Sequence, residues 1–479
     1  MTQTNETGRS NGASPTGAAS ATSETSATSA AAQNGQTTGT GPIGDAGPLY
    51  PLTDPAQFDP TATVSFSDRA KDPIGLPRLL AFLFPASAAL IAVFNGIQQI
   101  LIPAQVEAID PAHKVVNLAV LGTFAAIASM VGLPLGGNLS DRTRSRWGRR
   151  GPWILVLSVI SGVLIIAMGL RENLVLLGIV YTLLWLTSNM YQGALNAVLP
   201  DRIPIARRGI GSAIVGLGSP IGVLFGVQVA SHSSQFLGYT IIAVVFVVAS
   251  LLFLLGAREP SSVRLANAPL EIVEKSRAGV NGFFEAFRTR DFTLAFISRF
   301  ALFLSYSVVS GYLYYTLSDY IGTKNLPGHD VATSVSTMLT VTILVWVVVA
   351  TFCGWLADKL NRRKLFVGIA AIGLAATMFI PILDPTWPGM LLYSAFLGAF
   401  IGTYFAVDLA VMSLVLPHKD REGRDFGILA VATGLPGILA APIAGLLITL
   451  TGGYASLYVF GTICAIIAGV TMLWIRKIR

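Results

Sequence analysis

The stretch Gly137-Asn-Leu-Ser-Asp141-Arg142 closes one apolar run of the sequence, and Gly354-Trp-Leu-Ala-Asp358-Lys359 closes another. Asp358 follows Asp141 by 217 residues (358 − 141), and Val198-Leu-Pro200 returns at the same spacing as Val415-Leu-Pro417. Three more residues return after 216 positions: Arg208, Gly218 and Pro220 as Arg424, Gly434 and Pro436. Motifs that recur at a nearly constant spacing over half the chain indicate that the body of the protein is duplicated.

Composition indicates a membrane protein. Hydrophobic residues make up 53% and charged residues 12%, whereas about a quarter of a soluble chain is charged. A lipid-spanning segment needs roughly 20 apolar residues and takes helical form, because its backbone hydrogen bonds must close internally. The sequence predicts twelve such spans: 77–104, 115–139, 151–170, 173–199, 209–232, 236–256, 291–320, 331–356, 364–383, 389–416, 426–450 and 454–475.

The net charge of +7 follows the membrane topology. With the amino terminus inside, all but four of the 32 Lys and Arg residues fall on the cytoplasmic side, as the positive-inside rule requires. The exceptions are Lys114, Arg171 and Lys324 outside and Arg299 within a span. The basic residues therefore predict a multi-pass protein of the cell membrane with both termini cytoplasmic. They point to the lipid bilayer as a partner and to no nucleic acid.

The chain divides into four parts. Residues 1–70 are rich in Ser, Thr, Gly and Ala, too polar to bury a core, so we expect a disordered cytoplasmic tail. Residues 71–256 and 291–479 are expected to form two pseudo-symmetric six-helix halves, joined by a charged cytoplasmic linker over 257–290. The predicted fold class is thus all-α integral membrane, with twelve transmembrane helices.

The pattern G-x-L-[SA]-D-[RK] after the second span of each half resembles the major facilitator superfamily. This resemblance implies a secondary transporter that works by alternating access and is monomeric. The sequence shows no metal-ligand cluster, no nucleophile–base pair and no phosphate loop, so we expect no cofactor, no metal and no enzymatic activity. The resemblance implies that Asp141 accepts hydrogen bonds from a neighbouring helix terminus and that Arg142 pairs with an acid, which would stabilise the outward-open state. The implied gate residues are Gly137, Asp141, Arg142, Arg149, Arg150, Gly354, Asp358, Lys359 and Arg362. The alternative is a basic cluster that serves only topology.

A narrower resemblance rests on SDRTRSRWGRRGPWI at 140–154 and on Asn189-Met-Tyr-Gln192-Gly193. Both are similar to the glycoside–pentoside–hexuronide symporters and the related plant sucrose carriers. The resemblance implies a small-molecule substrate, a sugar, and a coupling cation, a proton. Two departures remain: Asn196 stands where the carriers have an Arg, and 115–139 has none of the carboxylates with which melibiose-type members bind a cation.

Polar side chains at mid-membrane depth gather on spans one, four, seven and ten, the helices that are equivalent under the repeat. Such groups need a partner or a water-filled pathway. Aromatic faces suit the C–H face of a sugar ring, and amides donate to and accept from hydroxyls. The alternative is packing between helices. The candidate substrate-binding residues are Asn95, Gln98, Gln99, Trp185, Asn189, Gln192, Asn196, Tyr306 and Tyr404.

Arg299 and Asp408 form the sharpest pair of candidates. Each lies about eight residues, or ~12 Å along a helix, from the same membrane surface, on spans seven and ten. An ion pair is therefore geometrically possible. Asp408 could carry the coupling proton with Arg299 controlling its pKa, or the two charges could only neutralise each other.

Two other functions stay open. One is a proton-driven exporter of drugs or metabolites, although Gly218-Ser-Pro220-Ile-Gly222 matches the exporters' antiporter signature only in part. The other is a non-transporting sensor on the same scaffold. The small residues Gly218, Gly222 and Gly226, mirrored by Gly437, Ala441 and Gly445, predict close helix approach, which we expect between the two halves.

Overall fold

The computed structural model describes residues 75–170, 172–203, 207–259, 261–262, 287–360, 362–415 and 422–475. The expected tail over 1–70 and most of the expected linker over 257–290 lie outside these ranges. Within the described residues, twelve helices are long and apolar enough to cross a membrane, so the predicted number of spans and the all-α class are confirmed.

The first half consists of six spans, and its first span is composite. The helices are α1 (Leu76–Gly96), a π-helical turn (Ile97–Leu101), α2 (Ile102–Ile109), α3 (Lys114–Arg142), α4 (Gly151–Gly169), α5 (Leu174–Arg202), α6 (Arg208–His232) and α7 (Gln235–Gly256). Local signals set several helix starts: proline stands in the first turn of α1 and α4, and the Asn173 side chain accepts the N–H groups of Val175 and Leu176 at the start of α5.

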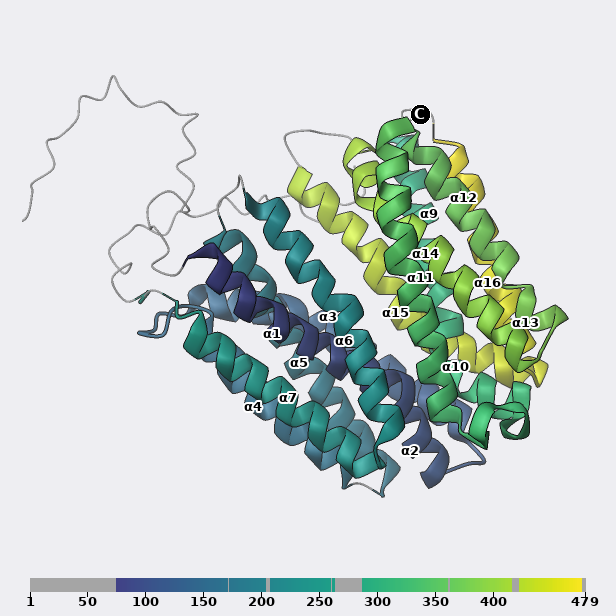
Figure 1. Ribbon diagram of the computed structural model, residues 1–479, viewed down its shortest axis with the longest axis horizontal. Helices are drawn as coiled ribbons and strands as arrows, with labels where there is room; N and C mark the ends of the chain where they lie inside the picture. The colour runs from purple at the N-terminus through teal and green to yellow at the C-terminus, as the bar shows by residue number, and fades with distance from the viewer. Residues whose placement is uncertain are drawn as a thin grey trace, which may run out of the picture. The chain divides into compact units, whose positions relative to one another are not determined.

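The second half repeats this plan. It contains α9 (Arg290–Ser310), α10 (Leu313–Tyr315), a π-helical segment (Thr316–Gly322), α11 (Val331–Leu360), α12 (Arg363–Thr377), α13 (Ile380–Leu383), α14 (Trp387–Val415), α15 (Glu422–Thr451) and α16 (Ala455–Leu473). Figure 1 shows α1, α4, α5 and α7 in one bundle and α9, α11, α12, α14 and α16 in the other.

One predicted boundary is wrong. The expected seventh span, 291–320, does not run as one helix, because α9 ends at Ser310 and the chain continues through α10 into the π-helical segment. The apolar run continues past the break, so hydropathy alone did not reveal it. With the repeat offset of 217 residues, Ile97–Leu101 corresponds to 314–318, which overlaps the π-helical segment Thr316–Gly322. Both halves therefore carry a π-helical turn in the same region of their first span. Such turns occur often at functional sites.

Glycines allow close helix packing within the first half. Gly222 and Gly226 of α6 face the backbone carbonyls of Ala88 and Ala92 in α1, where a Cβ atom would not fit. The expectation that this stripe packs between the halves is therefore wrong for α6. The i, i+4 spacing of small residues predicts a close approach, but it does not specify which neighbouring helix makes it.

Contacts between the halves gather at the end of the bundle that carries α2 and α10, which we call the distal end. There the Tyr312 hydroxyl donates to the carbonyl of Val115 (3.1 Å) and the Tyr315 hydroxyl donates to that of Pro103 (3.0 Å). A Cβ atom on Gly445 of α15 would lie 2.8 Å from Ala119 of α3. The distal end is therefore closed.

The other end carries Asp141 and Lys359, and we call it the motif end. Five glycines toward this end lie in α3, α6 and α15, and a Cβ atom on any of them would meet nothing within 4 Å in the described part of the chain: Gly137, Gly209, Gly216, Gly434 and Gly437. Closed packing at the distal end and free space at these positions indicate a structure open toward the motif end.

Candidate functional site

The π-helical turn of the first span carries Gln98 and Gln99. Gln98 is exposed and Gln99 half-buried, and the wider π turn changes the angle between them and Asn95 from that of a regular α-helix. The Asn95 amide donates to the carbonyl of Ile91 one turn earlier, at 3.0 Å. The i, i+3, i+4 spacing that places three side chains on one face of a regular α-helix therefore does not give the relative directions of these three amides.

Trp185 of α5 lies against the first span. Its ring stacks on Phe94 at 4.8 Å between centroids and 8° between planes, and Tyr181 meets it edge-on at 5.9 Å. One face of the indole is therefore already covered by a protein side chain.

Asn189 lies one turn further along α5. Its amide donates to the Ser129 hydroxyl of α3 at 3.0 Å and to the carbonyl of Trp185 at 2.8 Å. These contacts are the interhelical packing that the sequence left open as the alternative. Gln192 is half-buried and Asn196 exposed on the same helix, so their amides are the more accessible ones.

Arg299 of α9 and Asp408 of α14 are in contact. Arg299 Nη1 lies 2.7 Å from Asp408 Oδ2, with side chains 12% and 2% exposed. Arg299 Nε donates to the Thr433 hydroxyl of α15 at 2.8 Å, and its guanidinium lies 5.6 Å from the Phe303 ring centroid. Asp408 Oδ1 is buried and has no hydrogen-bond partner among the described residues.

Aromatic residues surround this charge pair. Tyr404, one turn before Asp408 on α14, is fully buried, and its ring meets Phe303 edge-on at 6.2 Å. Phe405 packs against Phe303 at 5.7 Å and stacks on Trp346 of α11 at 5.3 Å. The other candidate of the seventh span, Tyr306, is half-buried on α9. Nothing in the sequence distinguishes Thr433, Phe303, Phe405 and Trp346, because threonine and apolar aromatics are ordinary residues of a membrane helix.

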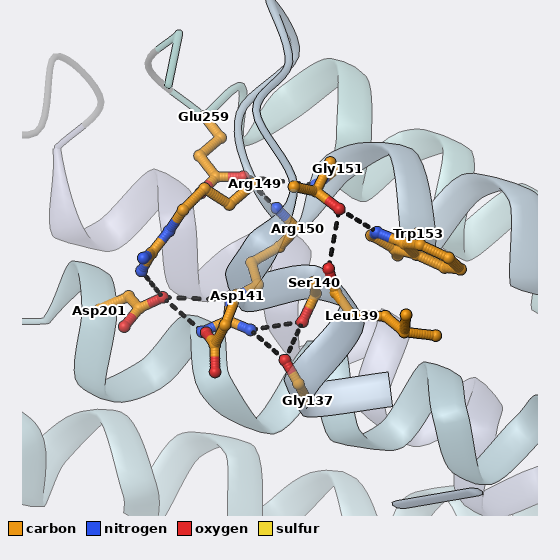
Figure 2. A network of polar contacts seen from close by, with 11 residues as sticks. Gly137, Leu139, Ser140, Asp141, Arg149, Arg150, Gly151, Trp153, Asp201 and Glu259 are labelled. Carbon is orange, nitrogen blue, oxygen red and sulfur yellow. Dashed lines mark hydrogen bonds and ion pairs between the residues drawn. The ribbon is translucent and has the colours of Figure 1, made fainter. Parts of the chain in front are cut away.

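At the motif end of the first half, Arg150 is the centre of a polar network (Figure 2). Its guanidinium contacts Asp141 and the Ser140 hydroxyl, and it lies 3.0 Å from Asp201 at the end of α5. Arg149 also reaches Asp201, at 3.0 Å. The described partner of Asp141 is thus Arg150, within its own half.

The start of α4, the next helix along the chain from Asp141, is capped by another acid, Glu259. Glu259 Oε2 accepts the backbone N–H groups of Arg150 (2.8 Å) and Gly151 (3.3 Å) at the start of α4, where a carboxylate is favoured. Gly148 has φ +85° in this turn, and a Cβ atom there would collide with Glu259. The role expected of Asp141 concerns the outward-open state and stays a prediction.

The remaining motif residues make fewer described contacts. Arg142 is exposed at the end of α3, and Gly137 contributes its carbonyl to Arg150 at 3.4 Å. In the second half, the Lys359 ammonium lies 4.9 Å from the Trp355 ring centroid, Gly354 is half-buried and Arg362 is exposed. The side chain of Asp358 lies outside what the structure describes.

A charged cluster at the distal end joins the halves. Lys114 Nζ lies 2.6 Å from Glu107 of its own half and 2.7 Å from Asp319 of the other. The Tyr454 hydroxyl donates to Asp319 at 2.6 Å. Burial opposes ionisation of Asp319, but the hydrogen bonds from Lys114, Tyr454 and Ser318 outweigh it and lower its pKa. No pattern in the sequence indicates this cluster, because its members come from four separate segments.

Comparisons with known proteins agree with this architecture. The family model described as Major Facilitator Superfamily matches residues 79–329 and 295–479. A putative transporter AmpG 4 of Rickettsia felis is 23% identical, over 76% of this chain and 89% of its own length. A lactose permease of Lactobacillus delbrueckii subsp. bulgaricus is 25% identical, over 55% of this chain and 44% of its own length.

Two solved structures share the fold. The nucleoside transporter NupG superposes with a TM-score of 0.66 at 13% identity, over 83% of this chain and 100% of its own. The peptide transporter POT gives 0.62 at 14% identity, over 83% and 94%. Together with the twelve spans and the family match over both halves, these likenesses establish that the chain belongs to the Major Facilitator Superfamily of membrane transporters.

Proposed function

We propose that this protein is a proton-coupled importer of a glycoside or oligosaccharide, on the branch of the superfamily that contains the glycoside–pentoside–hexuronide symporters. It would lie in the cell membrane with both termini in the cytoplasm. The distribution of Lys and Arg supports this orientation, which makes the motif end cytoplasmic and the described conformation inward-open. The family and fold favour a carrier over an enzyme.

The observation that carries the proposal is the Arg299–Asp408 pair. Two charges buried at membrane depth are costly and mark functional pathways by default, and replacing such a pair by apolar residues is often stabilising. Asp408 Oδ1 has no hydrogen-bond partner among the described residues, so this oxygen is available to a proton, and the loss of charge would weaken the attraction between Oδ2 and Arg299. Stability alone is therefore a weak reason to keep the pair. Proton coupling would use both the buried charges and the Oδ1 atom of Asp408 that lacks a described partner.

Sugar as the substrate class rests on the residues of the other half. Gln98, Gln99, Gln192 and Asn196 retain accessible amides, which suit hydroxyl groups because each amide donates and accepts. The lactose permease among the relatives supports the same class. The charge pair and these amides lie in different halves, so a substrate held between them would contact both and could respond to their movement.

The proposal is tested by measuring external pH when di- and trisaccharides are added singly to de-energised cells that express the protein. We expect alkalinisation with at least one sugar, because uptake of the sugar removes protons from the medium. In cells that express Asp408→Asn, the same sugar should cause no alkalinisation. Surface expression of both proteins is measured in parallel.

A variant outside the charge pair separates loss of coupling from loss of folding. Thr449→Val removes a hydroxyl whose described hydrogen bond lies within its own helix, to the carbonyl of Gly445 at 2.7 Å, and should leave alkalinisation unchanged. Alkalinisation by Asp408→Asn equal to that of the unmodified protein would refute the role of Asp408. If none of the di- and trisaccharides causes alkalinisation with the unmodified protein, sugar–proton symport is refuted.

A further inference from the structure

We infer that Thr433 is a positioning residue: its hydroxyl holds the Arg299 side chain between α14 and α15, so that a change in the charge of Asp408 is transmitted to α15. This inference rests on the coupling role proposed for Asp408. Thr433 does not itself touch a substrate in this account. It acts through Arg299.

The geometry of Arg299 makes it a link between three helices. The side chain starts on α9, Nη1 contacts Asp408 on α14, and Nε donates to Thr433 on α15. The guanidinium is planar and rigid, so these two contacts fix the plane of the group together. A movement that breaks one contact must therefore shift or weaken the other.

Protonation of Asp408 would change one of these contacts selectively. An ionised carboxylate attracts the guanidinium strongly at this burial, and a neutral carboxyl does not. Arg299 remains charged, because guanidinium does not lose its proton in proteins. Without the ion pair, the Arg299 guanidinium must pair with other acceptors. Its hydrogen bond to Thr433 transmits this change to α15.

Helix α15 is well placed to convert the change into a movement of the halves. It is joined to the first half at the distal end, where Cβ atoms added to Gly122 and Gly445 would lie 2.9 Å from Ala441 and 2.8 Å from Ala119. Near Thr433, by contrast, Gly434 and Gly437 meet nothing within 4 Å in the described structure. The helix is thus packed against the first half at its distal end, whereas near Thr433 its described contacts, such as that with Arg299 of α9, lie within its own half.

Two prolines lie inside α15. Pro436 comes three residues after Thr433, and Pro442 lies at the joint, next to Ala441. A proline inside a helix removes one backbone hydrogen bond and favours a bend. A pull on Thr433 would therefore tilt the motif end of α15 relative to its distal joint.

The charged and titratable groups that face Asp408 are few among the described side chains. Arg299 comes from α9, Tyr404 from α14, and α15 contributes the uncharged Thr433. Tyr404 carries no charge at neutral pH. Replacing Asp408 by Asn consequently imitates the protonated state without changing another charge in this cluster.

The test is a double-mutant cycle read as distances between the halves. Spin labels are attached at Ile210 of α6 and Phe352 of α11, both exposed near the motif end, in a background that carries Cys353→Ser and Cys464→Ala. Distance distributions in lipid nanodiscs then give the ratio of inward-open to closed molecules. We measure Asp408→Asn, Thr433→Val and the combination, with no substrate added.

We expect Asp408→Asn to change this ratio by about tenfold, equivalent to roughly 1.4 kcal/mol. In the Thr433→Val background the same change should be less than about twofold, because the link to α15 is gone. Thr433→Ser keeps the hydroxyl and should restore the full response. Thr449→Val, the matched threonine with a hydrogen bond inside α15, should not alter it.

Equal responses to Asp408→Asn with and without the Thr433 hydroxyl would overturn the inference, as would no response in any background. A Thr433→Val protein that aggregates is replaced in the cycle by Thr433→Ala, and the same criteria apply. Because no sugar is present, this result is independent of the pH measurement above. If a sugar causes alkalinisation but the effects of Asp408→Asn and Thr433→Val on the conformational ratio are additive, only the role of Thr433 is rejected.

Discussion

At the scale of single residues, Arg299 and Asp408 show what a sequence can and cannot specify. Their equal depth was predictable, because helical rise fixes depth once a span is located. The contact to Thr433 was not, since it depends on the rotation of three helices about their axes. Trp185 was predictable as an aromatic facing the bundle interior, whereas its stacking on Phe94 depends on packing between spans.

The charge pair leads to a prediction about stability. Arg299→Met leaves the buried Asp408 carboxylate uncompensated and should lower the free energy of unfolding by about 3 kcal/mol, whereas Arg299→Met combined with Asp408→Leu should recover most of this loss. Thermal unfolding in detergent measures both. The double variant should remain unable to couple protons. Equal destabilisation by the single and double variants would contradict this account.

Asp319 gives a prediction about pH. Its pKa is lowered from the ordinary 3.8, so its contribution to closing the distal end is complete above that value and is lost only as pH falls through the lowered pKa. We therefore expect the distal end to stay equally closed between about pH 5 and pH 8. Spin labels at Ser234 and Lys324, both exposed, report this distance. Opening within that range would show that another group controls the contact.

At the scale of elements, hydropathy located the twelve spans, but it could not locate their irregularities. The π-helical turns at Ile97–Leu101 and Thr316–Gly322 keep the apolar character of the helices that they interrupt. The glycine stripes correctly predicted that the helices approach closely, but not which helix each stripe packs against. Their partners differ, because Gly222 packs within its half, whereas Gly445 packs against α3 of the other half.

This difference can be tested with two alanines on α15. Gly445→Ala places a methyl group 2.8 Å from Ala119 and should separate α3 from α15 at the distal end, which lowers the inward-open fraction about tenfold (roughly 1.4 kcal/mol). Gly437→Ala, two turns earlier on the same stripe, meets open space and should have little effect. The label pair at Ile210 and Phe352 measures both variants. Similar effects of the two alanines would contradict the assignment of Gly445 to the joint.

At the scale of the whole molecule, the 217-residue repeat predicted two halves, but it could not predict which end is closed. Both conformations of a carrier are compatible with one hydrophobic pattern, and small differences in contacts choose between them. The closed distal end depends on contacts such as Lys114 with Asp319 and Tyr312 with Val115. These contacts join segments about 200 residues apart, and sequence spacing carries no signal for them.

Alternating access is tested by measuring the distances between the two halves at both ends of the same protein. Labels at Ser234 and Lys324 report the distal end, and labels at Ile210 and Phe352 report the motif end. Lys114→Met removes the cation between Glu107 and Asp319 and should open the distal end. We expect the motif end to close in the same molecules. Opening of the distal end with no change at the motif end would contradict alternating access.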